Sequence, residues 1–239
     1  VYASSMGDLS QNTEWSDTSV ENIYTEHQHQ LDVLNILDGL DASDFTEDNK
    51  VNYLLFKQQY ENSIESHTYK TFLIPFSHRG GIQLQHETTS IVPLRNKQHY
   101  LDWIERISKI DVLVDAAIEK AKIGIAEEIV PPRFLMQKVY KQIELQAFIE
   151  PKDSPFYRVF LEMDRSIDSL ETEEIQKKAL AVIKSNVIPA YIKLHRFFKD
   201  EYLPACRTSI GIKEIKNGKE YYEFLARKFT TTNLTPQEI

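Results

Sequence analysis

The seven histidines are the side chains in this sequence best suited to hold a metal ion. His27 and His29 lie two residues apart, which places them on different faces of a helix. His86-Glu87 is followed by Thr-Thr-Ser, so the second histidine of a zinc-protease helix, expected at the fourth position after the first, is missing. The remaining histidines are isolated in sequence: His67, His78, His99 and His195. We therefore predict no metal site in this chain.

Adjacent carboxylates occur at Glu127-Glu128 and Glu173-Glu174, near expected helix ends. Carboxylates in such positions usually face solvent or interact with the helix dipole, and only rarely form a catalytic pair. The sequence contains no Gly-x-Ser-x-Gly elbow, Walker loop or dinucleotide fingerprint. We predict no catalytic residue here, and the residues that would bind a substrate stay unassigned.

Cys206 is the single cysteine, which excludes an intrachain disulfide and leaves the redox compartment undecided. Its neighbour Arg207 could make the thiol reactive; the alternative is a small packing residue at a helix end. Arg133 and Arg207 could each clamp a carboxylate or form a salt bridge within a helical scaffold. For all three residues the packing or scaffold role is the one that the sequence favours.

Composition narrows the class of protein. The chain has 239 residues, 41% of them hydrophobic and 27% charged, which suits one large soluble domain or two small ones. The net charge of −8 and the lack of a basic run argue against non-specific nucleic-acid binding. No stretch of about 20 apolar residues occurs, so we predict no transmembrane segment.

One long helix, expected over Ala179–Arg207, would organise the fold. Its apolar residues recur at steps of three and four, which keeps them on one face. They are Leu180, Ile183, Val187, Tyr191, Leu194, Phe198 and Tyr202. Pro189 lies inside this run, and we expect it to kink the helix. Glu173 marks the expected start of this helical region.

Two helices are expected before residue 69. Thr18 and Glu21 have the spacing of a capping box, and the helix they begin would end at Gly39. Thr46 is the expected cap of the second helix, which should fade after Ile64. Residues 1–17 are polar and aperiodic, which indicates a loop.

Residues 69–86 are the least helical part. A β-prone run, Thr71 to Ile74, is interrupted by Pro75, and Arg79-Gly-Gly81 indicates a turn. We expect a long structured loop or one short hairpin. Loops of this length in compact domains are often functional, which makes this segment a candidate binding element.

Helical periodicity returns at Asn96. One stripe would run over about seven turns, from Tyr100 to Ile125, by way of Trp103, Ile107, Ile110, Val114, Ala117 and Ala121. Pro131-Pro132 should open another helix, whose buried side is expected at Phe134, Val139, Ile143 and Phe148. Ser154-Pro155 should cap a short helix that buries Phe156, Val159 and Phe160. The pattern predicts an all-α, antiparallel helical assembly in one domain, residues 1–239.

The last residues carry the signals of helix initiation. After the turn at Asn217-Gly218, a short helix is expected with Tyr221, Tyr222, Leu225 and Phe229 in the core. Thr235, Pro236 and Glu238 then form a capping box with proline in the first turn. Leu234 and Ile239 occupy the positions of a hydrophobic staple. We interpret the chain as an N-terminal fragment; the alternative is a frayed tail.

Five motifs, taken in order, resemble a known family. They are Ile129-Val-Pro-Pro-Arg-Phe134, Ser154-Pro-Phe-Tyr157, Val187-Ile-Pro-Ala-Tyr191, Glu201-Tyr-Leu-Pro-Ala-Cys-Arg207 and Thr230-Thr-Thr-Asn-Leu-Thr-Pro-Gln-Glu-Ile239. Together they resemble the N-terminal part of the bacterial domain-of-unknown-function 885 family, as does the opening Val1-Tyr-Ala-Ser-Ser-Met-Gly-Asp8.

That resemblance implies a helical, zinc-metallopeptidase-like protein of the bacterial envelope or periplasm, often a lipoprotein anchored upstream of Val1. The family's His-Glu…His helix lies in the second half and is absent from this sequence. The full-length protein would then hold zinc and bind peptide, whereas this fragment would wall one side of the cleft and dock against the C-terminal half. The alternative is a non-enzymatic helical binding or scaffold module.

Overall fold

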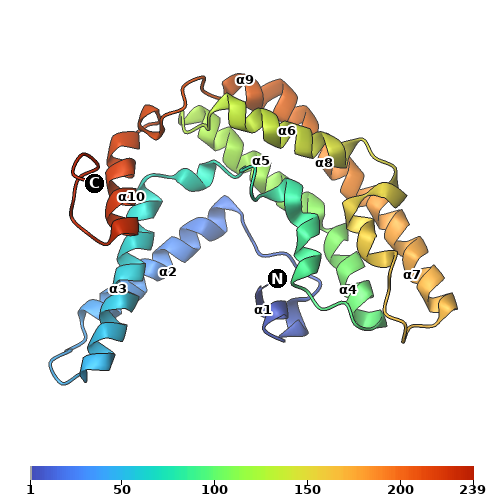
Figure 1. Cartoon of the computed structure of the whole chain (residues 1–239), viewed down its shortest axis with the longest axis horizontal. Helices are drawn as coiled ribbons and strands as arrows, with labels where there is room; N and C mark the ends of the chain where they lie inside the picture. Colours follow the sequence, from blue (N-terminus) through green and yellow to red (C-terminus); the bar gives the residue numbers. More distant parts are fainter. Residues whose placement is uncertain (1) are drawn as a thin grey trace.

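The computed structural model describes residues 2–239, which form an arch of helices (Figure 1). α5 (Ile110–Ala126), α6 (Arg133–Ala147) and α8 (Ile188–Phe197) make the top of the arch. α4 (Lys97–Ser108) and α7 (Ser169–Val182) form one leg, and α2 (Val20–Asp38) with α3 (Glu47–Thr68) forms the other. Residues 2–239 contain no strand, only two isolated bridges, and the all-α class predicted from periodicity is confirmed.

The long helix is longer than expected. It begins at Ser169, where the Asp168 side chain accepts hydrogen bonds from the backbone N–H groups of Leu170 and Glu171. The predicted start at Glu173 is therefore four residues late. From α7 the helix continues through a π turn (Ile183–Val187), α8, a second π turn (Phe198–Tyr202) and α9 (Leu203–Ala205).

Each π turn ends two residues before a proline. Pro189 and Pro204 are both the second residue after a π turn ends. A proline has no N–H to donate, and its ring clashes with the carbonyl one turn back in an α-helix. The wide turns move that carbonyl and let the helix pass both prolines, so the interruption expected at Pro189 takes the form of a π turn.

The predicted stripe on this helix forms the centre of the core. Ile183, Val187, Tyr191, Leu194, Phe198 and Tyr202 are each at most 1% exposed, whereas Leu180 is half-buried. The Tyr191 hydroxyl donates to the carbonyl of Ile82 at 2.5 Å, which ties η3 (Ile82–Ser90) to this helix.

The stripe from Tyr100 to Ile125 is buried as predicted up to Ala121, but two helices carry it. α4 ends at Ser108, whose carbonyl accepts a hydrogen bond from the Asn186 side chain at 2.9 Å. α5 then begins after Lys109. Because Asn186 comes from the distant π turn, no local pattern reveals the break.

The buried side of α6 differs from the prediction at both ends. Val139 and Ile143 are fully buried, whereas Phe134 and Phe148 are 47% and 62% exposed. Phe134 lies five residues before Val139 and Phe148 five residues after Ile143, a spacing that corresponds to about 140° around a helix from those two buried positions. The segment after Ser154 is confirmed as a short helix of 3-10 type, η5 (Pro155–Phe160), with Ser154 as its cap.

The first seventeen residues are not merely a loop. They contain a helical turn, α1 (Tyr2–Ser5), and a 3-10 turn, η1 (Leu9–Gln11). Basic side chains of the core helices hold this segment by its carbonyls. Arg106 donates to the carbonyl of Gln11 at 2.8 Å, and Lys120 to that of Thr18 at 2.5 Å.

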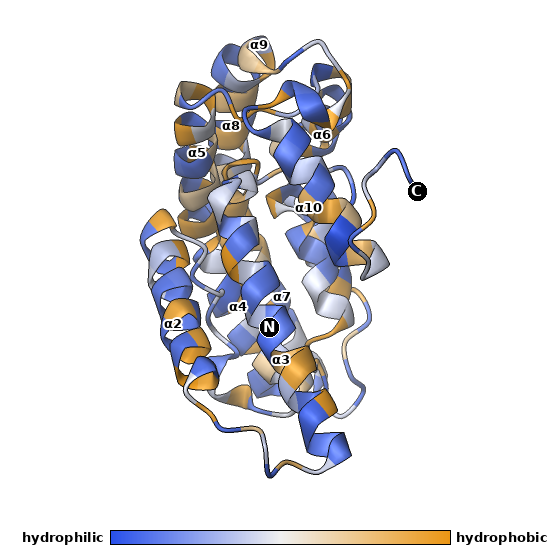
Figure 2. Cartoon of the chain, turned by 90° about the vertical axis from the view of Figure 1, so that its left-hand side faces the viewer, coloured by the Kyte–Doolittle hydropathy of each residue, from blue (hydrophilic) through white to orange (hydrophobic). Residues whose placement is uncertain are grey.

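α2 and α3 form a projecting hairpin, which we call the arm (Figures 1 and 2). Its first cap is Ser19, whose hydroxyl accepts from the N–H of Asn22 at 3.1 Å, so the predicted cap at Thr18 is one residue early. Thr46 caps α3 as predicted, but α3 extends to Thr68, beyond the expected end at Ile64. In the whole arm only Leu37 is fully buried.

α10 (Gly218–Thr230) packs beside the upper part of α3. Phe224 is its buried aromatic residue, 1% exposed, whereas Tyr222 and Phe229 are 50% and 78% exposed, against the prediction. At the C-terminal end, the Glu238 carboxylate accepts from the backbone N–H of Thr235 at 2.8 Å. The reciprocal bond of the predicted capping box is therefore present. None of the helices described is long and apolar enough to cross a bilayer.

Candidate binding groove

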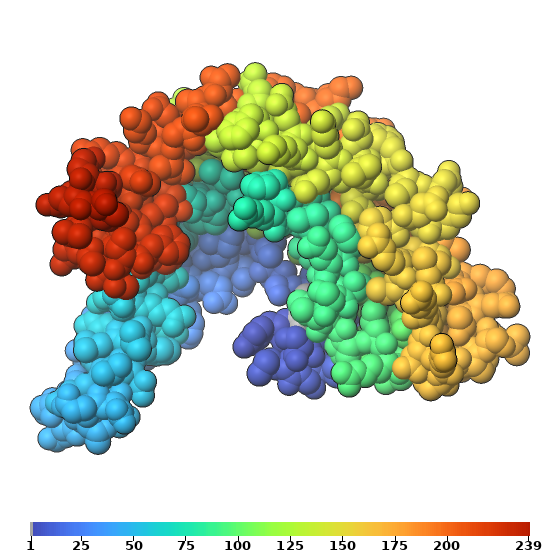
Figure 3. All heavy atoms as spheres, in the orientation of Figure 1, coloured from blue at the N-terminus to red at the C-terminus, as the bar shows by residue number. Residues whose placement is uncertain are grey.

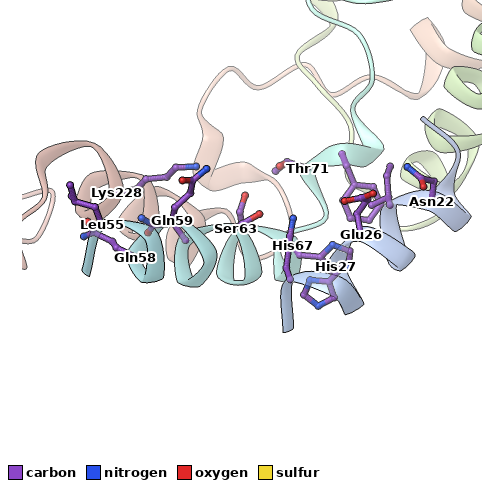
Figure 4. A pocket seen from close by; sticks show the side chains of 15 residues that line it. Asn22, Glu26, His27, Leu55, Gln58, Gln59, Ser63, His67, Thr71 and Lys228 are labelled. Carbon is purple, nitrogen blue, oxygen red and sulfur yellow. The ribbon is translucent and has the colours of Figure 1, made fainter. Parts of the chain in front are cut away.

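A groove of about 660 Å³ runs along one face of the arm (Figure 4). α2 and α3 supply its two sides, η2 (Thr71–Leu73) closes one end and α10 contributes Lys228 at the rim. On α3 the lining residues run from Leu55 to His67. At a rise of 1.5 Å per residue that is about 18 Å of helix, room for about five residues of an extended peptide.

Side chains with a carboxamide or a hydroxyl dominate the lining. They are Asn22, Gln30, Gln58, Gln59, Asn62, Ser63, Ser66 and Thr71. Asn22 donates to the carbonyl of Asp17, but the described residues offer no side-chain hydrogen bond to Gln58, Gln59 or Asn62. A carboxamide presents one donor side and one acceptor side, as a peptide bond does. The groove can therefore hydrogen-bond a neutral polar ligand.

His27 and His67 meet at the closed end of the groove. Their rings stack with centroids 3.7 Å apart and planes 5° from parallel. Tyr24 and Phe72 surround His67, with ring centroids 5.3 Å and 5.1 Å away. Burial lowers the pKa of His67, and the neighbouring His27 and Lys70 lower it further. Sequence spacing gave no sign of this pairing because the two residues lie on different helices.

The candidate binding element, residues 69–86, crosses the concave side of the arch, where the molecule is hollowed (Figure 3). It is a structured loop, as predicted, and contains η2, the beginning of η3 and a single antiparallel bridge between Ser77 and Gly80. Leu73, Phe76 and Ile82 anchor it in the core. Its role in binding stays a prediction.

The other histidines are held singly. The His86 ring lies 3.1 Å from the Gln146 side chain, and burial lowers the pKa of His86. His195 stacks on Tyr140 with ring centroids 4.8 Å apart. In the described part of the chain, no three His, Cys, Asp or Glu side chains are grouped so that they could hold a metal ion.

Arg133 and Arg207 were predicted to bind a carboxylate or to form a salt bridge. In the described structure both donate to backbone carbonyls instead. Arg133 donates to the carbonyls of Pro204 and Cys206, and Arg207 to those of Val130, Ser209 and Gly211. They fasten the end of the long helix to the start of α6.

The remaining candidates have structural surroundings. Cys206 is 2% exposed, and burial raises the pKa of its thiol to about 12, which favours the packing role. Glu127 pairs with Lys70 at 2.8 Å, and Glu173 lies 3.9 Å from Lys177. These contacts are those of a scaffold.

No curated protein matches this chain. A solved structure described as "The crystal structure of the putative lipoprotein from Colwellia psychrerythraea" superimposes with a TM-score of 0.85 at 19% sequence identity. The match covers 98% of this chain and 44% of that chain, so this chain spans less than half the length of the Colwellia protein.

At 19% identity that likeness shows the fold. The family is shown by a separate match, since the model described as "Bacterial protein of unknown function (DUF885)" covers residues 1–239. The resemblance carried by the five sequence motifs is thereby confirmed: the chain belongs to the DUF885 family of bacterial proteins of unknown function.

Proposed function

We propose that this chain is the helical, non-catalytic wall of a substrate cleft in a longer, zinc-metallopeptidase-like protein of the bacterial envelope. Two comparisons support the bacterial envelope location and the longer protein. The chain belongs to the DUF885 family of bacterial proteins, and the solved protein of the same fold, of which the match covers 44%, bears the description "putative lipoprotein".

The unfinished surface of the arm is the observation that carries the proposal. Val51, Leu54 and Leu55 of α3, which the helical period places on one face, are 55%, 61% and 60% exposed, and Ile36 of α2 is 64% exposed. Exposed apolar patches of this kind mark surfaces that pack against another structure. We propose that the C-terminal part of the polypeptide packs on the arm and turns the hollow under the arch into a cleft for a peptide.

Zinc does not fit the residues of this chain. Within residues 2–239 no three ligating side chains come together, and the two histidines that do meet have their rings stacked. Ring nitrogens bind a metal in the plane of the ring, and parallel stacked rings cannot both direct a lone pair at one ion. In the proposed protein the metal ligands therefore belong to the other part of the polypeptide.

A comparison of the full-length protein with this chain tests the proposal. We expect the full-length protein to hold about one zinc ion and to hydrolyse a peptide mixture in a chelator-sensitive way. This chain, purified alone, should do neither, as measured by elemental analysis and by mass spectrometry of the peptides. Chelator-sensitive hydrolysis by this chain alone, or a full-length protein without zinc, would overturn the assignment.

The docking of the arm has its own test in the full-length protein. Val51→Glu should lower the melting temperature, because it would place a charge in the proposed interface. Val112→Glu is the matched control, since Val112 is 64% exposed on α5, away from the arm. Equal effects of the two substitutions would show that the arm is not covered. This chain alone should self-associate in light scattering through the same surface.

A non-enzymatic binding module is the second candidate function. The polar groove along the arm favours it, because it is a ready binding site that needs no catalytic group. If the full-length protein binds peptides by calorimetry and leaves them intact over a day, this second function holds and the first fails.

A further inference from the structure

The stacked imidazoles of His27 and His67 connect α2 to the end of α3 beside η2 (Figure 4). Nδ1 of His27 is buried and has no hydrogen-bond partner among residues 2–239. Across the same residues, no carboxylate lies within ion-pairing distance of either ring. Among the described residues, a positive charge on the pair is therefore not matched by an ion pair.

The charged groups around the pair do not favour its protonation. Lys70, the residue before η2, lies near His67 and is itself paired at 2.8 Å with Glu127, the residue after α5. Lys228 reaches the groove from α10, and Glu26 of α2 is the carboxylate that lines it. Burial, His27 and Lys70 all lower the pKa of His67, in that order of size. Two imidazolium rings at 3.7 Å would repel each other.

The arm has little else to hold its helices together at this end. α3 contains no fully buried residue, and the single buried residue of α2, Leu37, lies at the opposite end, where its carbonyl accepts from the Tyr53 hydroxyl. Elements with few buried apolar contacts open at low cost in free energy. A change in the contact between two rings can therefore move the helices.

We propose that the His27–His67 stack is a proton-operated latch: it holds α2 against α3 when both rings are neutral, and it releases α2 when both become charged. Because α2 and α3 supply the two sides of the groove, release changes the groove's width. The latch does not depend on the function proposed above, since it needs only this chain.

Titration of the histidine ring protons by NMR between pH 8 and pH 5 gives the first test. Interacting rings lose their protons in two coupled steps. We expect the stacked pair to show two such steps. A single, independent step for each ring would overturn the proposal.

Hydrogen exchange gives the second test. After correction for the intrinsic effect of pH, amides of α2 should exchange at least tenfold faster at pH 5 than at pH 7.5. His67→Phe keeps an aromatic ring that cannot be charged, so this acceleration should fall below twofold. His29→Phe is the matched control and should behave as the wild type.

An acceleration that persists in His67→Phe would overturn the latch. His27→Phe, on α2, removes the same repulsion between charged rings. It replaces His67→Phe in this test if the latter does not fold. The proposed peptidase function concerns the full-length protein, whereas the latch concerns this chain. If the full-length protein hydrolyses peptides and this chain shows no acceleration of exchange, the latch fails and the peptidase function stands.

Discussion

A Cβ atom at Gly124 would lie 2.7 Å from the carbonyl oxygen of Leu73 and 2.9 Å from that of Ile129. Gly124 belongs to α5, and Leu73 ends η2, the first anchored part of the segment that crosses the concave side. The lack of a side chain at Gly124 is thus what allows this segment to pass directly over the helix.

Gly124→Ala should therefore destabilise the protein, because two backbone carbonyls would have to move. Overpacking of this kind costs about 1–3 kcal/mol. Gly211→Ala is the control, since a Cβ there meets nothing closer than 3.7 Å. Urea unfolding followed by circular dichroism would measure both, and an unchanged midpoint for Gly124→Ala would contradict the close approach.

Tyr191→Phe removes the hydrogen bond to the carbonyl of Ile82 and leaves that carbonyl without its partner. A buried group that loses its partner costs about 1–3 kcal/mol. Tyr222→Phe makes the same chemical change at a side chain that is 50% exposed, and it should be nearly neutral. Thermal unfolding compares the two, and equal melting temperatures would speak against the contact.

Ser19→Ala should destabilise α2 by about 1 kcal/mol, the usual cost of losing an N-cap. Thr18→Ala, one residue earlier, should change stability by less than about 0.5 kcal/mol. If denaturant unfolding showed a larger loss of stability for Thr18→Ala than for Ser19→Ala, Thr18 would be the cap of α2.

Cys206 should react slowly with a thiol reagent at pH 8 in the native protein. Burial raises the pKa of this thiol to about 12, so the reactive thiolate is scarce, and the sulfur is shielded as well. Addition of denaturant should restore the full rate. Rapid labelling of the native protein would instead identify Cys206 as a reactive thiol.

Periodicity and caps could be predicted because they depend on neighbours in sequence. The stripe from Ile183 to Tyr202 and the caps Thr46 and Ser154 follow from spacing of three or four residues and from local hydrogen bonds. The prediction was wrong at Phe134 and Phe148, whose exposed rings lie five residues from the buried Val139 and Ile143, a step that does not return to the same face of a helix.

Long-range contacts could not be predicted in this way. The break after Ser108 depends on Asn186, and the course of residues 69–86 depends on Gly124 in α5. Arg133 and Arg207 looked like carboxylate ligands or salt-bridge partners, but the fold places helix-end carbonyls in their reach.

The sequence by itself thus determined the helical class, the family motifs and the lack of a zinc-protease helix, since each is a pattern of neighbouring residues. Only the tertiary structure decided that α2 and α3 lie side by side, which forms the groove and brings His27 to His67 across forty positions of sequence. The physical reason is that backbone hydrogen bonds act over a few residues, whereas the packing of helices joins residues at any separation.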